Sequence, residues 1–339
     1  MLKPFATALA LLLPATLTAQ PAPERVGLVD RVLDQHILPG FDDLAKATSQ
    51  LAMVAAQNCS PDNEDLREAY GRAFDAWVRV SHLRFGPSEV QNRAFALAFW
   101  PDPRNKTPKA LARLLADQDV ALLAPEEYTE LSIAARGFYA LEYLLYEPQL
   151  QQPAAYACAL VQAGSADIAR LSAAINADWA DYADLMRAPH ADGPYKTNAE
   201  ATQELFKALL TGLQFTTDMR LGRPLGTFDR PRPKRAEARR SQRSTRHIAL
   251  AVDELEELAL MLAREGSGLQ AELAVAFEDT HQAIDAIDSP DLSSVATPFG
   301  WLQADIVRLN LHSRITEELM PPLGEELGVP AGFNALDGD

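Results

Sequence analysis

The sequence predicts an all-α protein built from two helical bundles packed against each other. Its composition is rich in alanine and leucine and low in glycine, which suits helices better than sheets. Apolar residues recur at steps of three and four through most of the chain, which is the spacing of amphipathic helices. No segment alternates cleanly between apolar and polar residues, as a half-buried strand would.

The first predicted helix lies within residues 26–51, where apolar side chains repeat at helical spacing. Pro39 falls inside this stretch and predicts a kink or a split, because proline lacks the amide hydrogen that an α-helix uses. Ser60 and Pro61 then offer an N-cap and a first-turn proline to a second helix over residues 66–80.

The middle of the chain is less regular before helices resume. Trp100-Pro101-Asp102-Pro103 cannot continue a helix, and Thr107-Pro108 restarts one. Apolar stripes predict the next helices over residues 125–145 and 153–186, and residues 188–195 form a break that contains prolines and a glycine. The stripes of the second half cover residues 205–213, 248–262, 277–287 and 299–319.

The chain is long enough for two domains of typical size. We expect an N-terminal helical bundle over residues 24–160 and a C-terminal helical bundle over residues 161–339.

The N-terminal residues resemble a cleavable export signal over residues 1–19. Lys3 gives a positive start, residues 5–13 form an apolar stretch of signal-peptide length, and Ala19 offers a small residue for cleavage. The apolar stretch is too short to span a membrane, and no later segment approaches that length. We therefore expect a soluble protein that is released into the bacterial periplasm, without a membrane span.

The formal net charge of −16 disfavours nucleic acid as a partner, because a phosphate backbone is bound by basic surfaces. Residues 229–247 are strongly basic against this acidic background. One interpretation is a solvated loop folded against an acidic surface, whose deletion leaves the fold intact. The other is that the loop Arg232–Arg243 docks on an anionic cell-envelope protein partner or a lipid headgroup.

The chain has two cysteines, Cys59 and Cys158. In an exported protein an even number of cysteines favours one disulfide over two free thiols.

Five segments together resemble the imelysin family of exported bacterial helical proteins. The resemblance is closest to the branch that carries a pair of cysteines, and the segments cover nearly the whole mature chain. They are AWVRVSHLRFGP at residues 76–87, FWPDPRNKT at 99–107, GFYALEYLL at 137–145, MRLGRPLG at 219–226 and GFNALDGD at 332–339.

The resemblance implies two helical bundles related by internal duplication, with a site near their junction. The family was named for a proposed metallopeptidase activity, and its members are linked to iron uptake. Its hallmark is the motif GxHxxE, of which Gly137 and Glu142 are present here. Tyr139 stands where the family has histidine.

Glu142 falls on the apolar stripe of its helix, where a carboxylate is costly unless it is paired, hydrogen-bonded or bound to a metal. Tyr139 lies on the same side, so a phenol and a carboxylate face one space. This space is either a ligand site or the place of a buried glutamate satisfied by an arginine or a tyrosine. If the two side chains meet, Arg84 is the simplest counter-ion for Glu142, which is also the candidate metal ligand. The predicted ligand-binding residues are Tyr139, Glu142, His82, Arg84, Glu89, Asp102 and Arg104.

Catalysis is not supported by the residues themselves. A zinc peptidase needs three protein ligands, a position for water and a general base, but HExxH is absent and the six histidines are scattered. The sequence Glu278-Asp279-Thr280-His281 gives an isolated ExxH, whereas a di-iron bundle needs two. A phenol replaces histidine poorly at a zinc site, because it must first lose a proton. No catalytic residue is therefore assigned.

The leading hypothesis is a non-enzymatic binding or accessory protein of the periplasm, associated with iron acquisition, with its ligand site between the bundles. Its cofactor is unknown, and any iron or other divalent metal is expected to bind weakly. One alternative is a metal-dependent peptidase of the imelysin type. Another is a structural partner of a redox or outer-membrane assembly.

Overall fold

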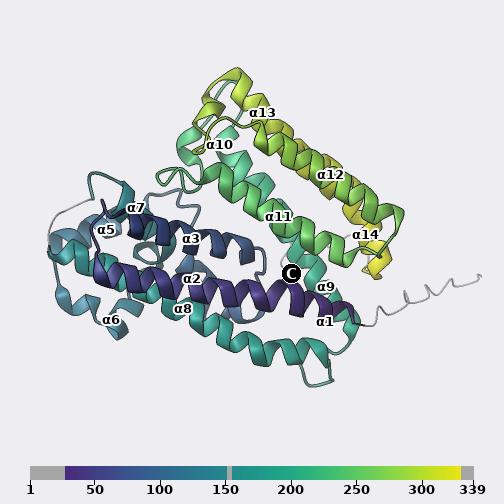
Figure 1. The fold of residues 1–339 in the computed structure, drawn as a ribbon, viewed down its shortest axis with the longest axis horizontal. Helices are drawn as coiled ribbons and strands as arrows, with labels where there is room; N and C mark the ends of the chain where they lie inside the picture. Colours follow the sequence, from purple (N-terminus) through teal and green to yellow (C-terminus); the bar gives the residue numbers. More distant parts are fainter. Residues whose placement is uncertain (1–26, 151–154, 330–339) are drawn as a thin grey trace, which may run out of the picture.

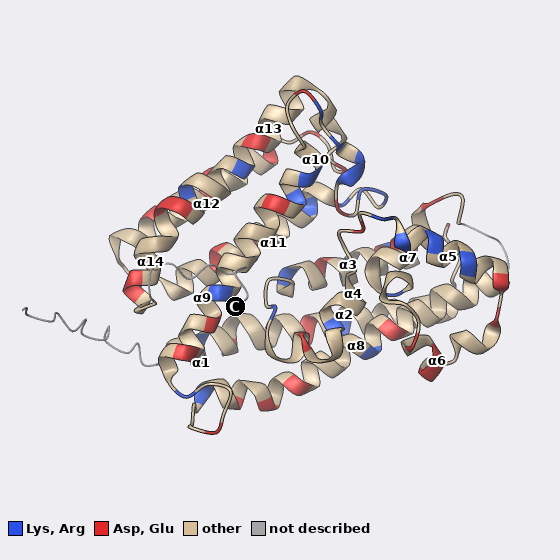
Figure 2. Ribbon diagram, turned by 180° about the vertical axis from the view of Figure 1, so that it is seen from behind, with Lys and Arg blue, Asp and Glu red and all other residues tan. Residues whose placement is uncertain are grey.

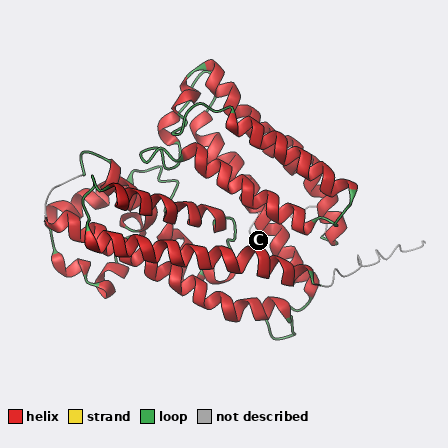
Figure 3. Ribbon diagram, in the orientation of Figure 1, coloured by secondary structure: helices red, strands yellow, loops and turns green. Residues whose placement is uncertain are grey.

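The protein is described by a computed structural model that covers residues 27–150 and 155–329. Every named element in these residues is a helix and none is a strand, which confirms the predicted all-α class (Figure 3). Among the described residues, no helix is long and apolar enough to cross a membrane. The predicted signal peptide at residues 1–19 and the segment GFNALDGD at 332–339 lie outside the described residues.

The first group of helices is organised around α2 (Leu38–Gln57), which packs along α3 (Glu64–Val80) and α8 (Ala155–Arg187) (Figure 1). Helix α7 (Gly137–Tyr146) packs on α8. The shorter helices of this group are α1 (Leu28–Val32), α4 (Arg93–Leu97), α5 (Lys106–Asp117) and α6 (Pro125–Thr129).

Pro39 does not end its helix. The π-helical segment η1 (Leu33–Ile37) joins α1 to α2, and Pro39 lies in the first turn of α2. A π-helical turn changes the local hydrogen-bond register, so the helix continues past a residue that has no amide hydrogen.

The second group contains α11 (Ser244–Leu262) and α12 (Gly268–Asp285), which pack against each other. In Figure 1 these helices are inclined to α2, α3 and α8. The other members are α9 (Asn198–Gln214), the π-helical η6 (Phe215–Gly222), α10 (Arg223–Leu225), α13 (Pro298–Leu309), the π-helical η9 (Asn310–Leu319) and α14 (Met320–Leu327).

The predicted boundary between residues 160 and 161 falls inside α8. This helix packs on α2 of the first group, and Trp179 of α8 stacks on Phe41 of α2 with ring centroids 5.3 Å apart. The chain therefore passes to the second group only after Arg187. Buried apolar side chains of both groups form one contiguous cluster. The origin of the two bundles by duplication stays a prediction.

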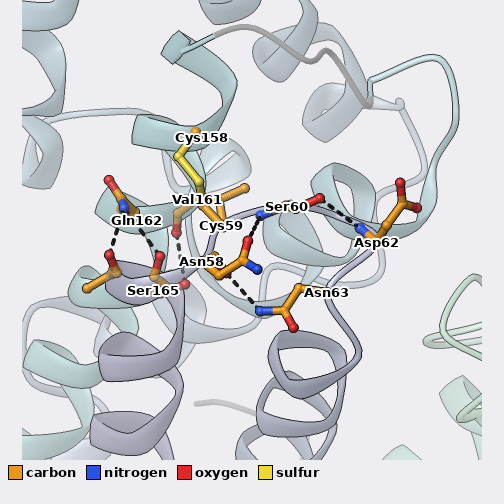
Figure 4. The surroundings of a disulfide bond; sticks show 11 residues. Asn58, Cys59, Ser60, Asp62, Asn63, Cys158, Val161, Gln162 and Ser165 are labelled. Carbon is orange, nitrogen blue, oxygen red and sulfur yellow. Dashed lines mark hydrogen bonds between the residues drawn. A yellow bond between two sulfur atoms is a disulfide. The ribbon is translucent and has the colours of Figure 1, made fainter.

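The predicted disulfide is confirmed. Cys59 follows the C-terminal end of α2 and is bonded to Cys158 of α8, with the two Cα atoms 5.2 Å apart (Figure 4). Beside this bond, Nε2 of Gln162 donates to the carbonyl oxygens of Ala55 and Ala56, each at 3.3 Å. The end of α2 is thus fixed to α8 by a covalent bond and by hydrogen bonds.

The basic segment folds against acidic residues, as one interpretation expected, but its middle is buried and not solvated. Figure 2 shows lysine and arginine gathered in the connection between α10 and α11. Within it Ala236, Glu237 and Ala238 are buried, and Nε of Arg240 donates to Glu147 at 2.7 Å. The segment packs because its charges find acidic partners on the first group of helices. This removes the reason to expect that its deletion leaves the fold intact.

Candidate functional site

The position of α7 depends on Gly137, its first residue. Gly137 has φ of 75°, a left-handed conformation that favours glycine. A Cβ atom here would lie 2.2 Å from the carbonyl oxygen of Leu97. The close approach of this backbone to the end of α4 fixes the first turn of α7, from which Tyr139 and Glu142 follow along the chain.

Glu142 is buried, and the residues that satisfy it come from the basic segment. Its Oε1 accepts hydrogen bonds from the backbone N–H of Ser241 at 3.0 Å and from the Ser241 hydroxyl at 2.8 Å. Nη1 of Arg240 lies 4.0 Å from its Oε2. Arg84 is paired with Glu89 instead, because its Nε donates to that carboxylate at 2.5 Å.

Tyr139 is also buried, and its hydroxyl donates to Oε1 of Glu237. Burial raises the pKa of the phenol well above its usual value, and the negative charge of Glu237 raises it further. The phenol therefore keeps its proton at neutral pH. Ligation of ferric iron by a Tyr139 phenolate, which requires loss of that proton, does not fit this environment.

Glu237 is buried together with Arg220, whose Nε donates to its Oε2 at 2.7 Å. Burial by itself raises the pKa of the carboxyl group. The charge of Arg220, the neighbouring His247 imidazole and the hydrogen bond from Tyr139 outweigh burial and lower the pKa to about 2. Glu237 is therefore an ionised carboxylate at the centre of a buried polar cluster.

Arg220 connects the two groups of helices. It lies in η6, where its Nη1 donates to the hydroxyl of Thr216 at 3.2 Å, and its Nη2 reaches the hydroxyl of Ser81 at 3.1 Å. Ser81 follows the last residue of α3. One guanidinium group thus binds a carboxylate of the connecting segment and a hydroxyl of the first group.

His247 is fully buried next to this cluster. Its Nδ1 lies 3.6 Å from Oε2 of Glu237, and its Nε2 lies 3.9 Å from Oδ1 of Asp75 in α3. Arg243 donates to the same aspartate, as does Nε of Arg246 at 2.8 Å. The polar cluster therefore continues as ion pairs between α11, the basic segment and α3.

A small cavity of about 70 Å³ lies against these groups. It brings together three of the predicted ligand-binding residues with two polar groups of the second half of the chain. The five are His82, Arg84, Tyr139, Arg220 and Glu237. Trp100, Phe215 and Leu255 add apolar walls. Burial, with the neighbouring His36 and Arg220, lowers the pKa of His82 well below its usual value.

The other predicted residues do not line this cavity. Glu142 binds Ser241, and Glu89 binds Arg84. Asp102 accepts from the backbone N–H groups of Arg104 at 3.3 Å and Thr107 at 2.8 Å, so it stabilises a turn.

Sequence reasoning missed Arg220, Glu237 and Ser241. The segment MRLGRPLG contains Arg220, but its basic character alone does not show that the side chain is buried. A signal for Glu237 was present, because it is the only acidic residue between Arg230 and His247.

The residues at the GxHxxE position do not fit a metal centre. Oε1 of Glu142 accepts two hydrogen bonds, and the Tyr139 hydroxyl keeps its proton and donates a hydrogen bond to Glu237. Within the part of the chain that the structure describes, the group of His, Cys, Asp and Glu side chains with metal-ligand spacing is His36, Glu254 and Glu257. That group does not include Glu142.

This arrangement defines a class of protein in which two groups of helices are joined by buried ion pairs around a small polar cavity. The chain belongs to the imelysin family, because the family model described as Imelysin, peptidase family M75, matches residues 37–305. The resemblance seen in the sequence is thereby confirmed. No curated protein sequence matches the chain.

Two solved structures share the fold. An imelysin-like protein from Psychrobacter arcticum 273-4 matches with a TM-score of 0.74 and 19% identity, over 93% of this chain and 100% of its own. A protein from Parabacteroides distasonis ATCC 8503, described as an iron-regulated protein A precursor, matches with a TM-score of 0.56 and 13% identity. That match covers 86% of this chain and 94% of the other. At these identities the likeness concerns the fold alone.

Proposed function

We propose that this chain is a periplasmic binding protein that assists iron acquisition, with its ligand site in the cavity between the two groups of helices. The observation that carries the proposal is the lining of this cavity. His82 and Tyr139 come from the first group, and Arg220 and Glu237 come from η6 and the basic segment. Polar groups fixed by their own hydrogen bonds are preorganised to receive a small polar ligand.

The association with iron rests on family membership and on the name of the Parabacteroides distasonis protein. The periplasm is supported by the Cys59–Cys158 bond, since disulfides persist in oxidising compartments. The export signal at residues 1–19 remains a prediction.

Binding fits the cavity better than peptide hydrolysis does. A metallopeptidase holds its metal with three protein ligands and keeps a position for water. At the family motif, the side chains of Tyr139 and Glu142 are instead occupied by Glu237 and Ser241. We derive no hydrolytic step from them.

The proposal can be tested by filling the cavity in the living cell. Ala98 lines the cavity and is partly buried, so Ala98→Leu adds volume there. Overpacking of this kind costs about 1–3 kcal/mol, so the fold should survive. Under iron limitation by a chelator, the variant strain should grow like a strain that lacks the gene. In iron-rich medium it should grow like the wild type.

Ala110→Leu is the matched control, because Ala110 is partly buried on α5 and packs on the core but does not line the cavity. This control should grow normally under iron limitation, and thermal unfolding should show that both variants are folded. Normal growth of a folded Ala98→Leu strain would contradict the proposal. Cleavage of a fluorogenic peptide mixture by the purified wild type, abolished by Ala98→Leu, would support the peptidase instead.

A further inference from the structure

A second polar centre lies outside the cavity, where η1 of the first group meets α11 of the second. His36 belongs to η1, and Glu254 and Glu257 belong to α11. Nδ1 of His36 lies 3.7 Å from an oxygen of each glutamate. The three possible ligand atoms all lie within 4.8 Å of one another.

His36 is held with one nitrogen toward these carboxylates. Its side chain is 1% exposed, and its Nε2 lies 2.9 Å from Nε2 of His82. Two facing imidazole nitrogens at this distance share one proton, so one donates and the other accepts. Nδ1 of His36 is buried and has no hydrogen-bond partner among the described residues. A buried polar atom without a partner is costly, and this one points at two carboxylates.

The spacing fits a shared cation better than direct hydrogen bonds. A distance of 3.7 Å is too long for an N–H···O hydrogen bond. Ligand atoms about 2.0–2.2 Å from a tetrahedral ion lie roughly 3.3–3.6 Å from one another. A small movement of the glutamate side chains therefore brings all three atoms to coordination distance.

The charges and the access also fit a cation. Arg79 donates to Oε1 of Glu254, while Oε2 of the same carboxylate faces His36. A hollow of about 650 Å³, lined by His36, Glu254 and Glu257, provides an entry path. The hollow is also lined by Lys46 and Arg72 and by Asp43 and Asp75, whose charges cancel. The two glutamates with Arg79 therefore leave the lining with net negative charge.

We propose that His36, Glu254 and Glu257 form a binding site for a divalent transition-metal cation such as Zn²⁺ or Fe²⁺. An imidazole with two carboxylates suits these ions, and water completes the coordination. His82 is a positioning residue, because it accepts the Nε2 proton of His36 and directs the Nδ1 lone pair to the metal. The cation joins the two groups of helices at a site separate from the cavity proposed above.

The test is calorimetric titration of the purified protein with Zn²⁺ after removal of metal by a chelator. The wild type should bind one Zn²⁺ per chain through this centre. The informative variant is Glu257→Gln, because its side chain is 44% exposed and the fold should tolerate the change. Its affinity for Zn²⁺ should fall by at least about 10-fold. A loss of this size already follows when a residue that only supports a metal ligand is replaced, and Glu257 is itself a proposed ligand.

Glu256→Gln is the matched control on the same helix. Glu256 binds His281 at 2.9 Å and is absent from the proposed centre, so this variant should bind Zn²⁺ like the wild type. With Co²⁺ as a second probe, wild type and control should show visible d–d absorption that Glu257→Gln lacks. The proposal is overturned if the wild type binds no stoichiometric Zn²⁺. It is equally overturned if Glu257→Gln binds as tightly as the wild type, or if the affinity is lost in Glu256→Gln.

Discussion

Neutralising Glu237 should destabilise the protein strongly, because its partner Arg220 would be left as an uncompensated buried charge. The two side chains are each 4% exposed and their ion pair spans 2.7 Å. Glu237→Gln keeps the shape and leaves an oxygen that can still accept from Tyr139. The substitution therefore removes the charge more than the packing.

Two independent routes give the magnitude. Removing one partner of a buried ion pair costs about 3–5 kcal/mol. The pKa of Glu237 falls from 4.5 to about 2 in the folded protein, which corresponds to about 3 kcal/mol of stability at neutral pH. Since the two values agree, we expect Glu237→Gln to lower the free energy of unfolding by about 3–5 kcal/mol.

The pH dependence has a definite sign. The pKa of Glu237 is lower in the folded than in the unfolded chain, so its contribution is fully present above the unfolded value of 4.5. It is lost as the pH falls from 4.5 toward about 2. The free energy of unfolding of the wild type should therefore fall over this pH window. In Glu237→Gln the contribution of residue 237 to this fall should be absent.

Denaturant unfolding of wild type, Glu237→Gln, Arg220→Gln and the double variant measures these terms. The double variant should be more stable than the sum of the single changes predicts, because no uncompensated charge remains. A loss below about 1 kcal/mol for Glu237→Gln at neutral pH would refute the reasoning. So would additive effects of the two substitutions.

Two further substitutions test the framework around the site. Replacing Cys59 and Cys158 together by serine opens a loop with a sequence separation of 99, which should lower the free energy of unfolding by about 4–5 kcal/mol in the chain-entropy model. Equal denaturation midpoints for variant and wild type would contradict this. Gly137→Ala should cost about 1–3 kcal/mol or more, because the left-handed backbone and the nearby Leu97 carbonyl both exclude a Cβ. Gly268→Ala is the control. A Cβ added at Gly268 meets no neighbouring atom within 4 Å, so this substitution should be nearly neutral.

The sequence was sufficient for the features that depend on local pattern. Three- and four-residue spacing predicted the helices, and the place of Glu142 on an apolar stripe predicted its burial, which the structure confirms. The predicted export of the chain favoured a bond between Cys59 and Cys158, and the structure confirms that bond. These inferences rest on helical periodicity and on the expected cellular compartment. Neither requires knowledge of which distant segments of the chain are in contact.

The partners of the buried charges could not be predicted in this way. Ser241 lies 99 positions after Glu142, and helical spacing shows which way a side chain faces but not which segment it meets. The basic charge of residues 229–247 indicated a loop on an acidic surface, but charge does not show which acidic residues it meets or that its middle is buried. The acidic partners, Asp75 and Glu147, lie far away in the sequence.

The π-helical segments have a consequence for any insertion or deletion in this chain. His36 lies in η1 and Arg220 lies in η6, so both polar centres depend on helical turns with a wider hydrogen-bond register. Adding or removing one residue in a helix rotates every later side chain by about 100° relative to those before it. A single deletion in η1 or η6 that restored a regular α-helix would therefore rotate the side chains after the deletion relative to those before it. Side chains that now face the same neighbouring helix would then point in different directions. The residues that widen these turns are part of the geometry of the two centres, although they need not contact a ligand.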